Sequence, residues 1–302
     1  MSLPKKIKLV EVGPRDGLQN QGQFISTRDK TQFINMLSEC GYQSIETTSF
    51  VSPKWVPQMA DHKEVYESIY KKKGVTYPVL IPNMRGLDAA LAAGVKEIAI
   101  FTAASEAFTQ KNIHCSINES FLRFQPVVEK ALQHKMKIRG YVSTVIACPY
   151  AGDIAPYHVA YVAKRLFDLG CYEISLGDTM GVGTADKVKQ MIHTVAGIVP
   201  LAQLAGHFHD TFSQALTNIY ASLEMGMTVF DSSVSGLGGC PYAKGASGNV
   251  ATEDVLYMMR GLSIETGIVL DKVIEASIFI DRLLARPHGS KVTIALLSQQ
   301  KN

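Results

Sequence analysis

PYHVAYVAKRLFDLGCYEISLGD, residues 156–178, shows the unit from which the fold is built. Residues 156–169 carry apolar side chains at helical spacing, and Gly170 follows where a left-handed residue closes a helix without a Cβ penalty. Residues 173–176 then form a short apolar run typical of a buried strand. The segment therefore predicts a helix that leads directly into a strand.

The same unit recurs along the whole chain, with glycine again closing a helix at Gly41, Gly94 and Gly226. Short apolar runs predict eight strands, at residues 7–12, 44–50, 75–81, 97–102, 138–146, 173–176, 205–209 and 229–234. Helical periodicity predicts seven intervening helices, at residues 27–40, 60–72, 87–93, 116–135, 156–169, 185–199 and 212–225. Further helices are expected near 253–262 and 271–285.

Eight alternating units without a linker favour an α/β fold in one domain, the (β/α)8 or TIM barrel. We expect residues 1–302 to form a single catalytic domain, with the barrel at 7–262 and a C-terminal helical extension at 263–302. The alternative is a doubly wound open sheet. It is disfavoured because residues 13–17, GPRDG, replace the glycine-rich turn that such folds use to bind dinucleotides.

Composition limits the function classes. The chain has 302 residues, of which 46% are hydrophobic and 19% charged, so it can bury a large core and is not a disordered chain. A net charge of +3 is too weak for a nucleic-acid footprint but compatible with a small anionic substrate. No apolar run is long enough to cross a membrane, and no secretory leader is recognisable. The five cysteines form no C-x-x-C pair, so we expect a reducing, cytoplasmic location.

Barrel enzymes place their chemistry at the carboxyl ends of the strands, and unusual polar residues collect at those positions in this sequence. They are Arg15 and Asp16 after the first strand, Glu46 and Ser49 in the second, Asp178 after the sixth, His207 and His209 in the seventh, and Cys240 and Asn249 after the eighth. The barrel topology therefore predicts one shared site from residues scattered along the chain.

His207 and His209 give the sharpest local signal, because residues two apart on a strand point to one face and can offer two imidazoles to one ion. Asp16 is the expected third ligand, and Asn249 offers a carbonyl oxygen as a fourth. The alternative for the histidines is a hydrogen-bonded structural pair. The alternative for Asp16 is an ion pair with Arg15 or a turn contact.

Three further residues suit a catalytic site. Arg15 presents a permanent planar cation to a carboxylate or a developing oxyanion, although a surface ion pair is the competing interpretation. Glu46 lies inside a strand, where a carboxylate must be paired or support a metal. Residues 236–249 contain five glycines and are typical of a lid, on which Cys240 is a candidate acid or base.

Four motifs stand out: EVGPRDGLQN at 11–20, IETTSFVSP at 45–53, the His207-x-His209 pair, and SVSGLGGCPY at 233–242. Together they resemble the 3-hydroxy-3-methylglutaryl-CoA lyase family of the metallolyase barrels. The Arg-Asp-Gly turn and the histidine pair are shared by the whole superfamily, whereas the Gly-Gly-Cys-Pro loop is specific to the lyases. The resemblance covers residues 7 to 284.

The resemblance implies cleavage of 3-hydroxy-3-methylglutaryl-CoA to acetyl-CoA and acetoacetate, a step of leucine breakdown and ketone-body formation. It implies Mg²⁺ or Mn²⁺ held by Asp16, His207, His209 and Asn249, with Arg15 facing the thioester oxygen. Proton transfer is implied for Cys240, and the hydroxyl proton is accepted by His207, by Asp16 or by a metal-bound water. Support of metal and substrate is implied for Gln19, Glu46, Ser49 and Asp178. Family members are commonly dimers, so a homodimer is expected.

Three alternatives stay open at the sequence level. One is a Claisen-type condensing enzyme of the same superfamily, similar to isopropylmalate or homocitrate synthase. Another is a lyase for a longer 3-hydroxy-3-methyl acyl-CoA. The third is a metal-stabilised binding barrel without catalysis, which is disfavoured because Arg15, Cys240 and the glycine-rich loop are all present.

Overall fold

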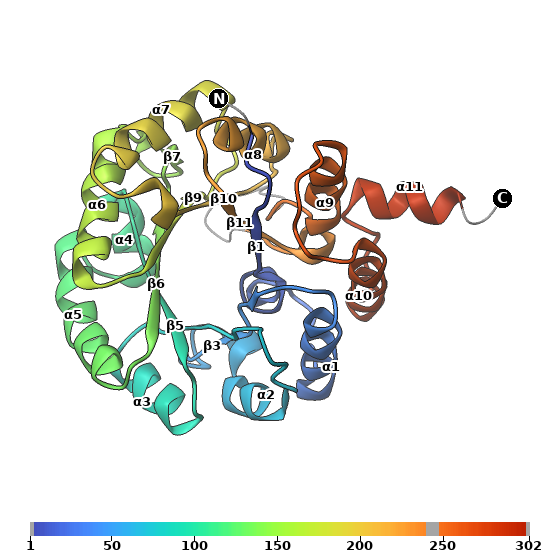
Figure 1. The fold of residues 1–302 in the computed structure, drawn as a ribbon. Coiled ribbons are helices and arrows are strands. Elements are labelled where there is room, and N and C mark those ends of the chain that lie inside the picture. The colour runs from blue at the N-terminus through green and yellow to red at the C-terminus, as the bar shows by residue number, and fades with distance from the viewer. Residues whose placement is uncertain (1–2, 240–247, 300–302) are drawn as a thin grey trace.

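The computed structural model describes residues 3–239 and 248–299 and has one large parallel sheet surrounded by helices (Figure 1). The sheet follows the order β2-β1-β11-β10-β9-β6-β5-β4-β3. Its strands are β1 Lys8–Glu11, β2 Ser44–Ile45, β3 Thr48–Ser49, β4 Val79–Leu80, β5 Glu97–Ala103, β6 Lys137–Ser143, β9 Glu173–Asp178, β10 Leu204–Phe208 and β11 Val229–Ser232. A separate antiparallel pair is formed by β7 Ala147–Cys148 and β8 Gly152–Asp153.

The segments β2 and β3 are two parts of one predicted strand, and they close the sheet on itself. β2 pairs with β1, whereas β3 pairs with β4. Between them the Glu46 amide donates to the Glu11 carbonyl at 2.8 Å and the Thr47 amide donates to the Pro78 carbonyl at 3.0 Å. The two edges of the sheet are therefore joined through one strand, and the predicted (β/α)8 barrel is confirmed.

Helices cover the outside of the barrel and pack against its apolar face (Figure 1). They are α1 Thr27–Ser38, α2 His62–Ser68, α3 Met84–Ala92, α4 Glu106–Ile113, α5 Ile117–Gln133, α6 Pro156–Leu169, α7 Ala185–Ala196, α8 Ala215–Glu224, α9 Thr252–Gly261 and α10 Leu270–Leu283. A last helix, α11 Lys291–Gln299, packs against α9 and extends away from the barrel (Figure 1). The local sequence explains where several of these helices begin or end. Ser116 and Glu119 form a capping box at the start of α5, and Gly170 closes α6 with a φ of 116°.

Some predicted boundaries differ from the structure. The helix α4 was not predicted; it begins where the Ser105 hydroxyl accepts from the Phe108 amide. The helix α11 was likewise not predicted as a separate element. The predicted strand 138–146 ends at Ser143, because Thr144 adopts a left-handed φ of 58°. The division of the chain at residue 262 stays a prediction.

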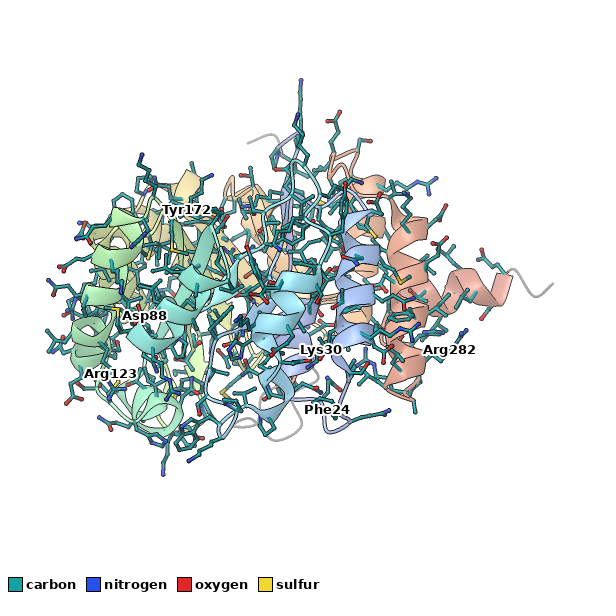
Figure 2. The ribbon with its side chains drawn as sticks, turned by 90° about the horizontal axis from the view of Figure 1, so that it is seen from below. Phe24, Lys30, Asp88, Arg123, Tyr172 and Arg282 are labelled. Atoms are coloured by element: carbon teal, nitrogen blue, oxygen red, sulfur yellow. The ribbon has the colours of Figure 1, made fainter. Side chains whose placement is uncertain are left out.

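A large cavity lies at one end of the barrel. Figure 2 shows Arg123 and Phe24 near one end and Tyr172 near the opposite end. Arg123 lines the large cavity described below, whereas Tyr172 immediately precedes β9. The cavity therefore opens at the carboxyl ends of the strands, as expected for a catalytic barrel. Within residues 3–239 and 248–299, no helix has both the length and the apolar character to span a membrane.

Candidate active site

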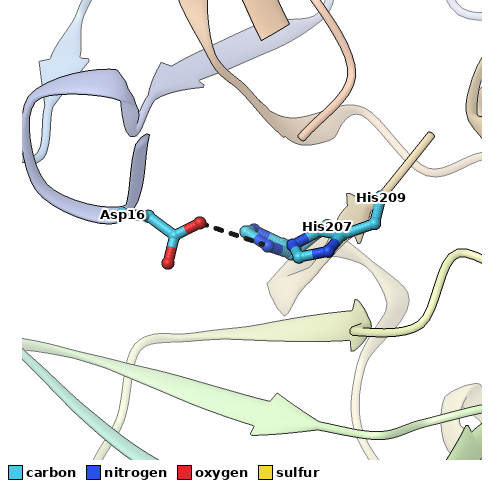
Figure 3. Close-up of side chains that lie close together, drawn as sticks. All are labelled: Asp16, His207 and His209. Atoms are coloured by element: carbon cyan, nitrogen blue, oxygen red, sulfur yellow. Dashed lines mark ion pairs between the residues drawn. The ribbon is translucent and has the colours of Figure 1, made fainter. Parts of the chain in front are cut away.

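Asp16, His207 and His209 form a compact cluster at the mouth of the barrel (Figure 3). Asp16 lies in the turn Gly13–Gly17 after β1, His207 lies in β10, and His209 follows that strand. One potential ligand atom from each residue lies within 4.8 Å of the others. The Asp16 Oδ2 atom is 4.0 Å from His207 Nε2, so the two face each other without a direct hydrogen bond.

The electrostatics of the cluster fit a cation. Burial favours the neutral acid at Asp16, but the charge of Arg15 and then the two imidazoles outweigh burial and lower its pKa. Burial and the neighbouring His207 lower the pKa of His209 to about 4, so its ring is neutral at neutral pH. A carboxylate that stays ionised and a neutral imidazole with a free lone pair form a donor set that suits a divalent cation.

Asn249 adjoins the cluster through its amide. Its Nδ2 atom donates to Asp16 Oδ2 at 2.7 Å and to the Leu237 carbonyl at 3.1 Å. The amide nitrogen therefore faces Asp16, and the carbonyl oxygen that the sequence predicts as a ligand points away from Asp16. A half-turn of the amide would bring its oxygen next to two acceptors, Asp16 Oδ2 and the Leu237 carbonyl, and a cation beside the oxygens would make that orientation favourable. Asn249 is close to the cluster, and its role as a ligand stays a prediction.

Arg15 is buried and held between two carboxylates. Its Nε and Nη2 atoms both lie 2.8 Å from Glu46 Oε2, and its Nη1 donates to Asp16 Oδ1 at 2.9 Å. Glu46 is completely buried, and burial raises its pKa although Arg15 opposes that shift. Arg15 therefore lies beside the Asp16–His207–His209 cluster with a fixed orientation. The surface ion pair that was the competing interpretation is not what the structure has, because these ion pairs are buried.

Three strand residues beneath the cluster were missed by the sequence analysis: Arg139, Tyr141 and Asp231. Asp231 Oδ2 lies 3.1 Å from His207 Nδ1, and both Asp231 oxygens accept from Arg139. The Tyr141 hydroxyl donates to Glu46 Oε2 at 3.2 Å and accepts from Arg139 at 2.8 Å. The available signal was the same as for Glu46, namely charged residues inside otherwise apolar strands.

A cavity of about 650 Å³ contains the cluster, within the size range typical of small-molecule sites. Ser49 and Gln19 line it, as predicted, together with Arg15. Toward solvent it is bounded by Trp55, His114 and Arg123, and the Trp55 and His114 rings lie 5.6 Å apart. One cavity therefore combines an inner polar end with an outer end that carries aromatic and cationic groups.

Two predicted site residues, Asp178 and Cys240, are not found lining the cavity among the described residues. The Asp178 carboxylate accepts from the backbone amides of Gly181, Val182 and Gly183, the last at 2.7 Å, and the side chain does not line the cavity. In this arrangement Asp178 holds the loop after β9, and its predicted support of metal and substrate stays a prediction. Cys240 lies outside the described residues, so its role stays a prediction.

Known proteins resemble this chain over nearly its whole length. A 3-hydroxy-3-isohexenylglutaryl-CoA/hydroxy-methylglutaryl-CoA lyase of Pseudomonas aeruginosa is 57% identical over 299 residues, covering 99% of this chain and 100% of the relative. The crystal structure of hydroxymethylglutaryl-CoA lyase from the same species superposes with a TM-score of 0.97 at 57% identity, covering 99% of this chain and 100% of that one. The structure of an HMG-CoA lyase from Acinetobacter baumannii in complex with coenzyme A and 3-methylmalate superposes with a TM-score of 0.92 at 37% identity, covering 96% and 95%.

The family model described as HMGL-like matches residues 6–280, which contain every described element from β1 to the greater part of α10. The match includes the Arg-Asp-Gly turn, the histidine pair and the strands that carry Glu46 and Asp231. With this coverage and an identity of 57% to a full-length relative, the chain belongs to the HMGL-like family.

Proposed function

We propose that this protein is a divalent-metal-dependent lyase that cleaves 3-hydroxy-3-methylglutaryl-CoA into acetyl-CoA and acetoacetate. The observation that carries the proposal is the buried Arg15 guanidinium beside the Asp16–His207–His209 cluster, both inside one cavity of a chain of the HMGL-like family. The reaction assigns the protein to leucine breakdown and ketone-body formation. The cytoplasmic location and the homodimer stay predictions.

The cleavage needs three operations. The proton of the tertiary hydroxyl is removed, the carbon–carbon bond next to it breaks, and the bond's electron pair forms the enolate of acetyl-CoA, which then takes up a proton. The Arg15 guanidinium donates hydrogen bonds to the thioester oxygen, where negative charge grows as the bond breaks. Asp16 and His207 are the two described candidates to accept the hydroxyl proton, and the proton donor to the enolate is predicted to be Cys240, which lies outside the described residues.

Asp16, His207, His209 and Asn249 would hold the metal, which supplies Lewis-acid polarisation of the substrate's oxygen atoms. One carboxylate and one amide oxygen suit Mg²⁺ or Mn²⁺, although two imidazoles also suit softer metals. Glu46 keeps the Arg15 guanidinium oriented in the metal's vicinity by its 2.8 Å contact. Ser49 and Gln19 border the space where the acyl group would lie.

The outer cavity supports a coenzyme A substrate. Trp55 and His114 offer ring faces to an adenine, and Arg123 offers a cation to phosphate groups. A longer 3-hydroxy-3-methyl acyl-CoA is a second candidate substrate. It is favoured by the apolar cavity wall of Leu80, Phe101 and Phe124, and by the isohexenyl substrate in the name of the Pseudomonas aeruginosa relative.

The testing experiment measures acetoacetate released from 3-hydroxy-3-methylglutaryl-CoA by the purified protein with Mg²⁺, with Mn²⁺ and with EDTA. We expect metal-dependent turnover that falls by roughly 10²- to 10³-fold or more in Arg15→Met, because a donor to the developing oxyanion is lost. Arg28→Met, which changes an exposed arginine on α1, is the matched control and keeps full activity.

Absence of turnover with either metal contradicts the proposal. Turnover of only the isohexenyl substrate selects the longer-chain lyase. Condensation of acetyl-CoA with a 2-oxo acid, without cleavage, selects the Claisen-type synthase.

A further inference from the structure

We propose that Asp231, clamped by Arg139, is a positioning residue that fixes the tautomer and the ring orientation of His207. It does so by accepting the hydrogen of His207 Nδ1, which leaves the lone pair of Nε2 directed toward Asp16. The inference rests on the proposed function in one respect, namely that the ion bound by His207 Nε2 is a divalent metal.

The first step of the argument is the geometry of the His207 ring. Its Nδ1 atom lies 3.1 Å from Asp231 Oδ2, whereas its Nε2 atom lies 4.0 Å from Asp16 Oδ2. A carboxylate only accepts hydrogen bonds, so Nδ1 must carry the hydrogen. A neutral imidazole with the hydrogen on Nδ1 has its lone pair on Nε2, and this nitrogen faces the cluster.

The second step is that Asp231 cannot turn away. Its Oδ1 accepts from Arg139 Nη2 at 2.7 Å, and its Oδ2 accepts from Arg139 Nη1 at 3.1 Å and from the Ser175 hydroxyl at 2.8 Å. Bidentate arginine–carboxylate pairs are the most strongly oriented ion pairs in proteins. The Asp231 side chain is fully buried, so water does not compete for these contacts.

The third step is that the clamp itself is held from the far side. Arg139 Nε donates to Glu173 Oε1 at 2.7 Å, and Arg139 Nη1 donates to the Tyr141 hydroxyl at 2.8 Å. The contacts join four neighbouring strands, since Arg139 lies in β6, Glu173 in β9, His207 in β10 and Asp231 in β11. The barrel wall therefore sets the angle of the imidazole.

This arrangement has the features of the outer contacts that tune metal-binding histidines, where loss of the partner typically weakens metal binding by about 10- to 100-fold. An ion pair that served the barrel alone would need Arg139, Asp231 and Glu173 but not the contact to His207. The two roles differ in a measurable way, because only the positioning role changes the state of the His207 ring.

The first measurement is the ¹⁵N NMR signature of the His207 side chain in the metal-free wild type, at an alkaline pH where the ring is neutral, assigned by comparison with His207→Ala. We expect the tautomer with the hydrogen on Nδ1. The opposite tautomer in the wild type overturns the proposal whether or not any variant folds.

The second measurement is the dissociation constant of Mn²⁺, followed by electron paramagnetic resonance. In Asp231→Asn we expect a mixture of tautomers and a dissociation constant raised by about 10- to 100-fold. Glu173→Gln is the matched control, because the glutamine oxygen can still accept from Arg139 Nε and keep the clamp in place, while a carboxylate charge on the same Arg139 is removed away from His207. We expect its His207 tautomer unchanged and its Mn²⁺ affinity within twofold of the wild type.

The proposal is overturned if Asp231→Asn keeps the wild-type tautomer of His207 and an Mn²⁺ affinity within twofold of the wild type. It is also overturned if Glu173→Gln loses as much Mn²⁺ affinity as Asp231→Asn. Failure of the proposed function is read separately, from the acetoacetate assay of the wild type. A protein without lyase turnover that still shows the Nδ1 tautomer, and loses it in Asp231→Asn, retains the positioning role of Asp231.

Discussion

At the scale of single residues, the partner of a buried carboxylate decides its protonation. Burial disfavours charge at Asp231, but the Arg139 guanidinium and His207 hold its pKa well below the usual range. Glu253 is equally buried, and the groups that donate to it among the described residues are neutral, including the Ser235 amide at 3.0 Å and the Thr293 hydroxyl at 3.2 Å. Burial therefore raises the pKa of Glu253 to about 7.

The raised pKa makes stability depend on pH. Between about pH 4.5 and pH 7 the unfolded chain releases the Glu253 proton and the folded chain keeps it, so the free energy of unfolding falls as the pH rises through this window. Glu253→Gln resembles the protonated acid and does not titrate. We expect its free energy of unfolding, relative to wild type, to rise by roughly 3 kcal/mol between pH 4.5 and pH 8 in urea unfolding. A difference that stays constant across this range contradicts the assignment.

The site residues that could be predicted lie near the carboxyl ends of strands or directly after them. Arg15, Asp16, His207 and His209 converge as expected, because the carboxyl ends of parallel strands meet at one rim. Asp231 was missed because it is a single carboxylate within a strand, without a repeated spacing such as that of the histidine pair, although it lies level with His207 across the β10–β11 pairing. The orientation of Asp178 could not be predicted, since it depends on three backbone amides of a loop whose path is not encoded in the residue pattern.

At the scale of elements, helix α10 is tied to the loop that follows β11. Near the end of α10, Asp281 accepts from the Ser235 hydroxyl at 2.6 Å, from Arg286 Nε at 2.7 Å and from His288 Nδ1 at 2.8 Å. Ser235 adopts a left-handed φ of 54° in that loop. The helix therefore holds the chain segment that leads toward Asn249 in a strained conformation.

Removing the carboxylate should loosen this connection. We expect Asp281→Ala to lower the free energy of unfolding by roughly 2–4 kcal/mol, because buried donors lose a charged acceptor. Glu275→Ala, on the exposed side of the same helix, is the control and should change it by less than about 0.5 kcal/mol. Urea unfolding of the three proteins measures the effect. Equal stabilities of the two variants would show that Asp281 does not hold the loop.

The existence of α10 could be predicted from helical periodicity, but its attachment to Ser235 could not, because the two residues are far apart in sequence. The helix α4 was missed because residues 106–113 carry too few apolar side chains on one face to give a clear period. Periodicity reports which face of an element is buried. It does not report which element covers that face.

At the scale of the whole molecule, the barrel interior holds an excess of carboxylates. In the described network the guanidinium groups of Arg15 and Arg139 face four carboxylates, Asp16, Glu46, Glu173 and Asp231. Lys8 reaches only Glu173, at 3.3 Å. Unbalanced negative charge in a buried region destabilises the fold, and a divalent cation at the cluster offsets it.

Metal binding should therefore be visible in thermal unfolding. A cation at about 100 times its dissociation constant adds about 2.7 kcal/mol to the folded state. For a chain of this size we expect a rise in Tm of roughly 5 °C relative to EDTA, measured by differential scanning calorimetry with Mg²⁺ or Mn²⁺. His209→Ala should lose this shift. A shift of equal size in that variant would place the ion elsewhere.

The junction between β2 and β3 links closure of the barrel to the geometry of the active site. Glu46 lies at the point where the second strand changes neighbours. Its backbone amide donates a hydrogen bond to the Glu11 carbonyl, and its side chain accepts one from Arg15. A chain whose ring is still open has no second strand in place and hence no carboxylate to orient Arg15. We therefore expect lyase activity only from molecules in which the sheet has closed into a barrel, even if the helices have already formed.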